Sequence, residues 1–175
     1  MHSLKRIDSP PGRIAVIIHG IGLVSFAASF LWLPHITNPL HAGFGGSYQF
    51  LTIIALTASM ITFGVGLIAD ISLSDRLFAL KNLLSMCATP LEVLISALYW
   101  SLHTIDKRLV VPPGHELPFI PDFGFHAMPA IMLVVDFILL SPSWAITGCQ
   151  ALVMSSGLFL FYWSWLEYCF SFNRW

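Results

Sequence analysis

Charged side chains are scarce in this sequence. Only 10% of its 175 residues are Asp, Glu, Lys or Arg, whereas a soluble globular domain carries about 25%. The formal net charge is -1, and binding to nucleic acid needs a basic patch. The scarcity of charge therefore argues against both a water-exposed globular protein and a nucleic-acid-binding protein.

Cysteine is also rare, and several catalytic motifs are missing. Cys87, Cys149 and Cys169 are far apart and lie in or at the end of apolar segments, which indicates neither a disulfide framework nor a metal site. Seven histidines are present, but none has HExxH or HxxxH spacing. The sequence contains no GxSxG elbow and no Gly-rich phosphate loop. We therefore predict no metal ion and no cofactor.

Hydrophobic residues are abundant instead. They make up 57% of the chain, and the mean hydropathy is +0.80. A membrane-spanning helix needs about 20 mostly apolar residues. Behind a polar N-terminal segment (1–13), five stretches meet this requirement, at about 14–33, 47–69, 83–102, 123–140 and 145–166. The sequence thus predicts an all-α, polytopic transmembrane helix bundle of about five spans over residues 14–175.

The second predicted span carries small and polar residues at a regular spacing. Thr52, Ser59 and Gly66 are seven residues apart and share one helical face. Such a seam usually marks helix packing in membranes. The simplest interpretation of Thr52 is therefore a packing residue whose hydroxyl donates to the carbonyl one turn back.

His126 lies about one turn inside the fourth predicted span, just after Asp122. It fits an interfacial histidine bonded to a loop, but an imidazole can also serve as a general base near neutral pH. The second and fourth spans start on the same side of the membrane, because an even number of crossings separates them. Thr52 and His126 should therefore lie at similar depth in one leaflet, where a hydroxyl and an imidazole could form a nucleophile–base pair.

Two carboxylates are predicted deep in the membrane, Glu92 after Pro90 and Asp136 in the middle of the fourth span. Ten residues along a helix span about 15 Å, so Asp136 cannot orient His126 directly unless the helix breaks, for example at Pro129. Asp136 has three open possibilities: pairing with a donor on another helix, staying protonated, or lining a polar cavity. We favour a structural or substrate-cavity role, and Ser59 is a second candidate for the cavity.

Several sequence blocks resemble a known family. Gly45-Gly46-Ser47-Tyr48-Gln49-Phe50-Leu51-Thr52, followed by Phe63-Gly64-Val65 and Asp70, is similar to a motif of the androgen-induced protein family. Three later blocks agree with the family in order, and together the blocks span roughly residues 43–175. These blocks are Pro90 with Tyr99-Trp100, Asp106-Lys107-Arg108 and Pro112; His126 with Pro129 and Asp136; and Tyr162-Trp163-Ser164-Trp165.

The resemblance implies an intramembrane hydrolase of lipid esters, such as fatty acid esters of hydroxy fatty acids. The family's catalytic threonine and histidine correspond to Thr52 and His126. His126 would take the proton of Thr52, whose alkoxide would attack the ester carbonyl to form an acyl-threonine. The expected partners are a lipid substrate and the bilayer, in the endoplasmic reticulum or another endomembrane, or in the plasma membrane. The sequence does not tell which protein partners, if any, the chain has.

The sequence departs from the family in two places. Animal members carry a different polar pair where this chain has Asp122 and Phe123, and the family usually continues past Asn173 into a further helix. We therefore expect a C-terminally truncated member, whether a splice product, a gene-model product or a fragment. A non-enzymatic scaffold or lipid-binding protein, including an inactive truncated member, remains the alternative to the hydrolase. A small transporter using Asp136 and Glu92 as a proton relay is disfavoured because we find no internal repeat.

Overall fold

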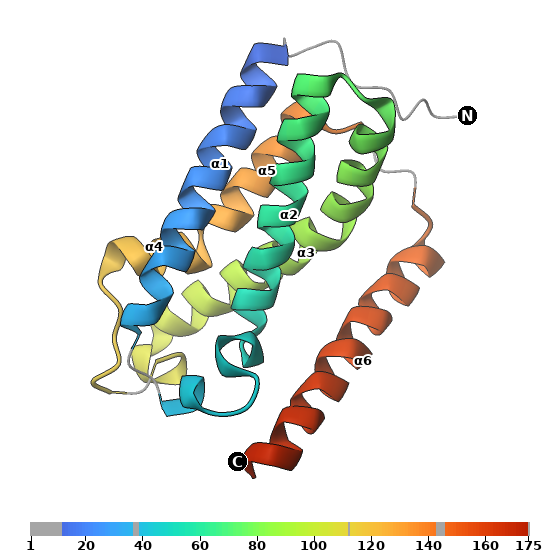
Figure 1. Ribbon diagram of the computed structural model, residues 1–175. Coiled ribbons are helices and arrows are strands. Elements are labelled where there is room, and N and C mark those ends of the chain that lie inside the picture. Colours follow the sequence, from blue (N-terminus) through green and yellow to red (C-terminus); the bar gives the residue numbers. More distant parts are fainter. Residues whose placement is uncertain (1–11, 37–38, 112, 143–145, 175) are drawn as a thin grey trace.

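The chain folds into helices in the computed structural model (Figure 1). The structure describes residues 12–36, 39–111, 113–142 and 146–174. No strand occurs in these ranges, so the all-α prediction is confirmed. The predicted polar N-terminal segment lies outside the described residues, except for its last two residues, which begin the first helix.

Six α-helices account for most of the described chain. They are α1 (Gly12–Trp32), α2 (Leu51–Ser72), α3 (Asp75–Ile105), α4 (Phe119–His126), α5 (Met128–Leu140) and α6 (Gly148–Asn173). Short 3-10 turns connect them: η1 (Leu33–His35), η2 (Pro39–Ala42), η3 (Gly46–Gln49) and η4 (Lys107–Leu109).

Four described segments are long and apolar enough to cross a membrane: Gly12–His35, Leu51–Ser72, Asp75–Ile105 and Gly148–Asn173. α4 and α5 meet the same criterion together, although they are bent by 43° where they join. Pro129 accounts for this break, because it has no N–H to donate to the carbonyl of Phe125. The described residues thus hold four candidate spans, or five when the bent pair counts as one, which confirms a multi-span bundle.

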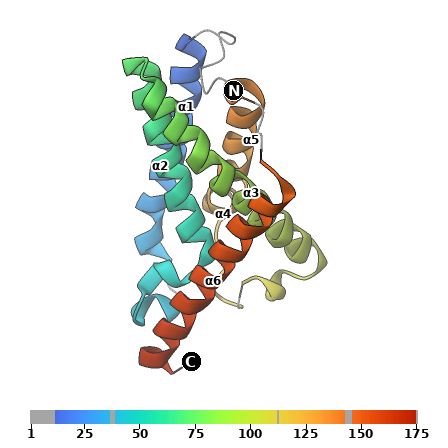
Figure 2. The ribbon, with the colours of Figure 1, turned by 90° about the vertical axis from the view of Figure 1, so that its right-hand side faces the viewer.

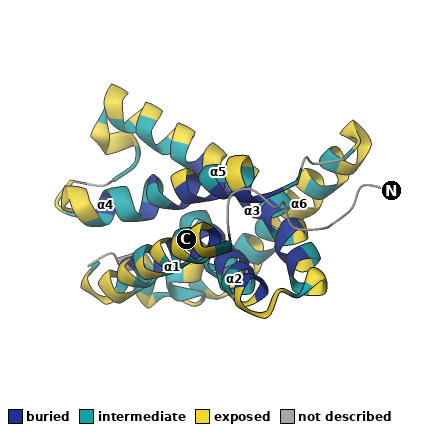
Figure 3. Cartoon of the chain, turned by 90° about the horizontal axis from the view of Figure 1, so that it is seen from above, coloured by how far each residue is buried: buried dark blue, intermediate teal, exposed yellow. Residues whose placement is uncertain are grey.

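α1, α2, α3 and α5 form the body of the bundle, with α2 and α3 as an antiparallel pair. Seen from above, the buried residues lie where these helices face one another (Figure 3). The core cluster is built around Phe26, Leu56, Phe63, Phe125 and Leu133. Many large apolar side chains point outward instead, as expected when the surrounding solvent is lipid.

Glycine allows α1 and α2 to approach closely. A Cβ added at Gly66 would lie 2.6 Å from the His19 ring, and one at Gly22 would lie 2.4 Å from the Phe63 ring. Each ring therefore occupies the space that a side chain on the facing helix would need. Small residues permit such close packing of helices in membranes, and Gly66 belongs to the predicted packing seam of α2.

α3 begins earlier than hydropathy indicates. The spans predicted at about 47–69 and 83–102 leave residues 70–82 as a connection, whereas α2 continues to Ser72 and α3 starts at Asp75. Ser74 caps α3 by accepting a hydrogen bond from the backbone N–H of Leu77. The early start places Lys81 inside the helix, where it is completely buried. The predicted loop position of Lys81 is therefore wrong.

α6 lies apart from the four-helix body in Figure 1, and in Figure 2 it crosses in front of that body. It is attached mainly to the loop that leads into α2. The Tyr162 hydroxyl donates to the carbonyl of Gln49 at 2.9 Å, and the Trp165 indole donates to that of Tyr48 at 2.9 Å. The attachment links α6 to the segment just before Thr52.

Candidate active site

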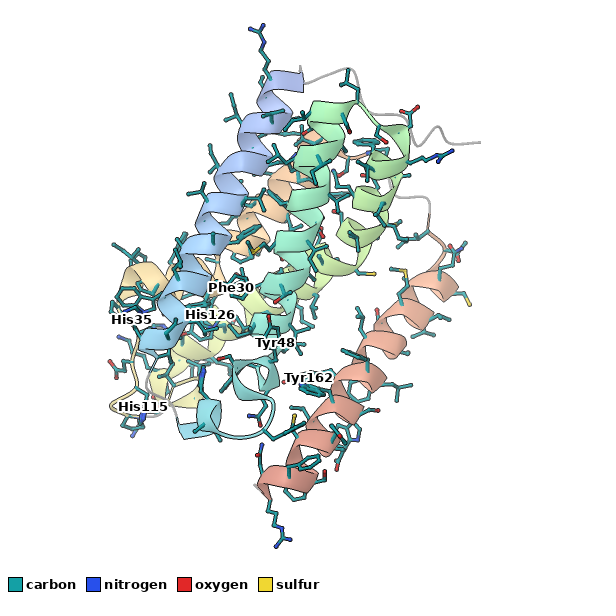
Figure 4. All side chains as sticks on the ribbon, viewed as in Figure 1. Phe30, His35, Tyr48, His115, His126 and Tyr162 are labelled. Carbon is teal, nitrogen blue, oxygen red and sulfur yellow. The ribbon has the colours of Figure 1, made fainter. Side chains whose placement is uncertain are left out.

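Thr52 and His126 line one cavity of about 120 Å³ at the end of the bundle where α2 starts and α4 ends. Figure 4 shows His126 inside this end, with Phe30 nearby. The lining side chains come from distant segments of the chain: Leu33, Ile36, His41, Phe50, Thr52, Ile53, Tyr99, Val110, Val111, His115, Leu117, Phe125 and His126. The structure thus brings together the two residues that helix parity predicts to lie at one depth.

The Thr52 hydroxyl differs from the other hydroxyls of α2. Those of Thr57, Ser59, Thr62 and Ser72 each donate to the carbonyl four residues earlier, at 2.6–2.8 Å. Thr52 is the second residue of α2 and makes no such bond within the described structure. Its hydroxyl is therefore available to the cavity, rather than being used in its own helix as a packing residue's would be.

The His126 imidazole is held by a carboxylate one turn earlier on α4. Its Nδ1 lies 2.9 Å from Oδ1 of Asp122 and 3.1 Å from the Asp122 carbonyl. Since both neighbours are acceptors, Nδ1 carries the proton in the assigned tautomer. The unprotonated Nε2 is then the nitrogen that can take a proton from a hydroxyl.

Tyr99 fixes the same group from α3. Its ring stacks on the His126 ring with 3.5 Å between centroids and an interplanar angle of 1°. Its hydroxyl donates to Oδ1 of Asp122 at 2.5 Å. Asp122 is buried, and its Oδ1 accepts from both partners. The three side chains form one hydrogen-bonded and stacked unit beside Thr52.

No hydrogen bond joins Thr52 to His126 within the described structure. Catalytic hydrogen bonds are often long or poorly aligned before substrate binds. The arrangement therefore supplies a free hydroxyl and an oriented imidazole on one cavity, without a preformed contact between them.

Ser59 and Asp136, the two other predicted cavity residues, do not line this cavity. The Ser59 hydroxyl lies 2.8 Å from the Ala55 carbonyl and 3.0 Å from Oε1 of Glu92, so it links α2 to α3. Asp136 belongs to a separate buried polar cluster.

The Asp136 cluster joins four helices. Lys81 Nζ donates to both carboxylate oxygens of Asp136 at 2.8 Å and to Ser141 Oγ at 2.9 Å. His19 lies between two carboxylates, with Nδ1 at 2.7 Å from Asp70 and Nε2 at 3.0 Å from Asp136. Of the three possibilities for Asp136, the structure shows pairing with donors on other helices.

No group of three or more His, Cys, Asp or Glu side chains in the described chain has the geometry to hold a metal ion.

An apolar cavity of about 300 Å³ lies on the other side of the start of α2, between α6 and the α2–α3 pair. Leu51 and Ile54 contribute to it, and they flank the residues that line the Thr52 cavity. Apolar volume is therefore present on both sides of the candidate nucleophile.

Sequence comparison provides the family. Residues 14–175 match the FAR-17a/AIG1-like protein family. The chain belongs to this family. The motif resemblance to the androgen-induced proteins is thereby confirmed. The matched range includes every residue placed at the candidate site.

Two relatives show how far the similarity reaches. The chain is 30% identical to a UPF0641 membrane protein of Schizosaccharomyces pombe over 162 residues, which is 90% of this chain and 72% of that protein. It is 27% identical to the Androgen-induced gene 1 protein of Homo sapiens over 126 residues, which is 63% of this chain and 52% of the human protein. No solved structure matches the chain.

Sequence reasoning missed that Asp122 and Tyr99 hold the His126 imidazole. Asp122 precedes His126 by four residues, and that spacing places two side chains on one helical face. The signal was present, but the helix was predicted to begin at Phe123, which left Asp122 in a loop. Tyr99 could not be found in this way, because it reaches the site from another helix.

Proposed function

We propose that this AIG1-like membrane protein hydrolyses esters of lipids, with Thr52 as the nucleophile and His126 as the general base. One observation carries the proposal. The hydroxyl of α2 that has no carbonyl partner within the described structure shares a cavity with an imidazole whose Nδ1 is held by Asp122.

The chemistry has two steps. Nε2 of His126 takes the Thr52 proton while the hydroxyl oxygen attacks the ester carbonyl, and the imidazolium then gives that proton to the leaving alkoxide. Water, activated by the same imidazole, hydrolyses the acyl-threonine. Asp122 stabilises the imidazolium that forms between these transfers.

A lipid substrate fits the surroundings of the site. The cavity walls are mostly apolar, and a second apolar cavity lies beside α6. The surrounding helices expose Ile, Leu and Phe side chains to the bilayer. We propose esters with long acyl chains, such as the fatty acid esters of hydroxy fatty acids that the family resemblance implies, with the endoplasmic reticulum or plasma membrane as the location.

A paired substitution tests the proposal in isolated membranes. Thr52→Ala and His126→Ala should lower lipid-ester hydrolysis by about 10³-fold or more, and Thr52→Ala should abolish labelling by a fluorophosphonate probe. Thr57→Ala is the matched control, because it removes the same side chain from the same helix where the hydroxyl only serves the Ile53 carbonyl. Equal turnover in wild type, Thr52→Ala and His126→Ala, at equal protein abundance, would rule the hydrolase out.

A non-enzymatic lipid-binding protein is the second candidate. It is favoured by the missing hydrogen bond between Thr52 and His126 within the described structure, and by the position of α6, whose most apolar stretch is not buried in the bundle. It predicts that wild-type membranes show neither probe labelling nor ester hydrolysis, while a photoreactive fatty acid still crosslinks to α6.

A further inference from the structure

His41 is a second imidazole on the candidate site, and its position is built by the loop before α2. It lies in η2 and lines the same cavity as Thr52. Its ring packs on Phe50 with 4.9 Å between centroids and an interplanar angle of 31°. The proposed hydrolase mechanism uses His126 alone, so the role of His41 is open.

The loop geometry brings Ser47 onto His41. Gly45 and Gly46 adopt positive φ angles of 91° and 51°, which turn the chain back on itself. The Gln49 amide ties the turn by donating to the carbonyls of Leu40 and Gly46 at 2.9 and 3.2 Å. Ser47 Oγ then lies 2.7 Å from Nδ1 of His41.

The contact with Ser47 occupies Nδ1 of His41, so Nε2 is the ring nitrogen that can bond to a molecule in the cavity. Ser47 does not line the cavity, whereas His41 does. The Nδ1 side of the ring therefore contacts Ser47, and the other side is open to the cavity. When the Ser47 hydroxyl donates to Nδ1, the ring proton resides on Nε2. Burial lowers the pKa of His41, which keeps the ring neutral near pH 7.

Apart from the candidate nucleophile Thr52, the other polar side chains of the cavity take part in different hydrogen bonds. His126 uses Nδ1–H toward Asp122, and Tyr99 gives its hydroxyl proton to the same carboxylate. His115 Nδ1 faces the Pro113 carbonyl at 3.4 Å, which leaves its Nε2 as an acceptor in the neutral ring. Among the described ring side chains that line the cavity, His41 has a hydroxyl partner, Ser47, that can donate to Nδ1 and so leave an Nε2–H to donate.

We propose that Nε2–H of His41, held in this tautomer by Ser47, is the hydrogen-bond donor for the oxyanion formed when Thr52 attacks an ester. In that step the Thr52 oxygen bonds to the carbonyl carbon, the Thr52 proton moves to His126, and the π pair moves onto the carbonyl oxygen. The negative oxygen accepts from His41. Collapse of the intermediate returns the pair and expels the alkoxide, which takes the proton from His126.

This role rests on the proposed hydrolase function and adds a catalytic residue to it. An oxyanion donor acts on the transition state more than on the bound ester, so its loss lowers kcat more than it changes KM. Removing one such donor typically lowers kcat by about 10²- to 10³-fold. A neutral amide N–H near the same place should restore part of the rate. An oxyanion donor needs an N–H, but it does not need to gain or lose a proton during the reaction.

Three substitutions test the role on the full chain, with the p-nitrophenyl ester of a long-chain fatty acid as substrate. His41→Leu should lower kcat by about 10²-fold or more, with KM changed by less than about threefold. His41→Gln, which keeps an N–H, should stay within about tenfold of wild type. Ser47→Ala should fall between them, because the tautomer is no longer fixed. Thermal unfolding of each variant in detergent checks that the fold persists.

The outcomes separate this proposal from the underlying one. Full activity of His41→Leu together with an inactive Thr52→Ala would overturn the role of His41 and leave the hydrolase intact. An active Thr52→Ala with an inactive Ser47→Ala would make Ser47 the nucleophile and overturn both. Loss of the acidic limb of the pH–kcat profile in His41→Gln would show a base in place of a donor, and would also overturn the role.

Discussion

At the scale of single residues, the position of one acceptor oxygen controls the candidate base. Oδ1 of Asp122 accepts from both Nδ1 of His126 and the Tyr99 hydroxyl. The alternative tautomer of His126 would place a lone pair against this oxygen and a proton on Nε2, where it could no longer accept from Thr52. Asp122 therefore acts through His126 as a positioning residue.

Removing this oxygen and removing only its charge should have different effects. Asp122→Ala should lower kcat by about 10²-fold, because neither ring orientation nor tautomer is then fixed. Asp122→Asn keeps an Oδ1 acceptor for both donors, but it removes the charge that stabilises the imidazolium, so kcat should still fall by more than about tenfold. Steady-state kinetics on both variants, with their thermal unfolding as a control, makes the comparison. Identical kcat values for Asp122→Ala and wild type would contradict a positioning role.

At the scale of helices, α6 is held by polar contacts at one end. Asn173 accepts from the Phe44 N–H at 2.7 Å and donates to the Phe44 carbonyl at 3.0 Å. Phe44 also stacks on Phe172 with ring centroids 4.4 Å apart. These contacts couple the end of α6 to the loop that carries His41 and Ser47, on which the oxyanion donor depends.

Asn173→Ala should loosen this coupling without unfolding the bundle. We expect faster amide hydrogen exchange in residues 39–49 and in the last turns of α6, while exchange in α1, α2 and α5 is unchanged. Ser171→Ala is the control, since the Ser171 hydroxyl donates only within its own helix, to the Tyr168 carbonyl. Mass spectrometry of exchanged protein in detergent provides the measurement, and equal exchange in the loop for both variants would refute the coupling.

Hydropathy located the membrane-spanning helices, but it did not give the correct start of α3. Apolar length is a property of a short window, which is why the spans and the all-α class could be predicted. The break between α4 and α5 at Pro129 could also be anticipated, since proline removes a helical hydrogen bond. The start of α3 could not, because Lys81 reads as a loop residue until its partner Asp136 is placed beside it.

At the scale of the whole molecule, a buried ion cluster links α1, α2, α3 and α5. His19, Lys81 and Asp136 are each almost completely buried. A charge inside a membrane is costly unless it is paired, and here each charge has a partner on a different helix. The cluster and the Thr52 cavity share no residue, so we expect the cluster to set stability rather than chemistry.

A double-substitution experiment tests that division. Lys81→Met should lower the free energy of unfolding by about 3–5 kcal/mol, because it leaves Asp136 without its cation. Adding Asp136→Asn removes the carboxylate charge that has lost its lysine partner, and it should recover part of this loss. Thermal or denaturant unfolding in detergent measures both. A Lys81→Met protein as stable as wild type would show that the ion pair contributes little.

The sequence by itself determined that this protein lies in a lipid bilayer, that it is all-α, and which family it belongs to. Composition and motifs are carried by consecutive residues, and they do not depend on how the helices pack. Helix parity also placed Thr52 and His126 at one depth. Only the tertiary structure decided that they share a cavity, that Tyr99 and Asp122 hold the imidazole, and that His41 faces the same space. Those relations join residues far apart in the chain, and the packing of side chains sets them.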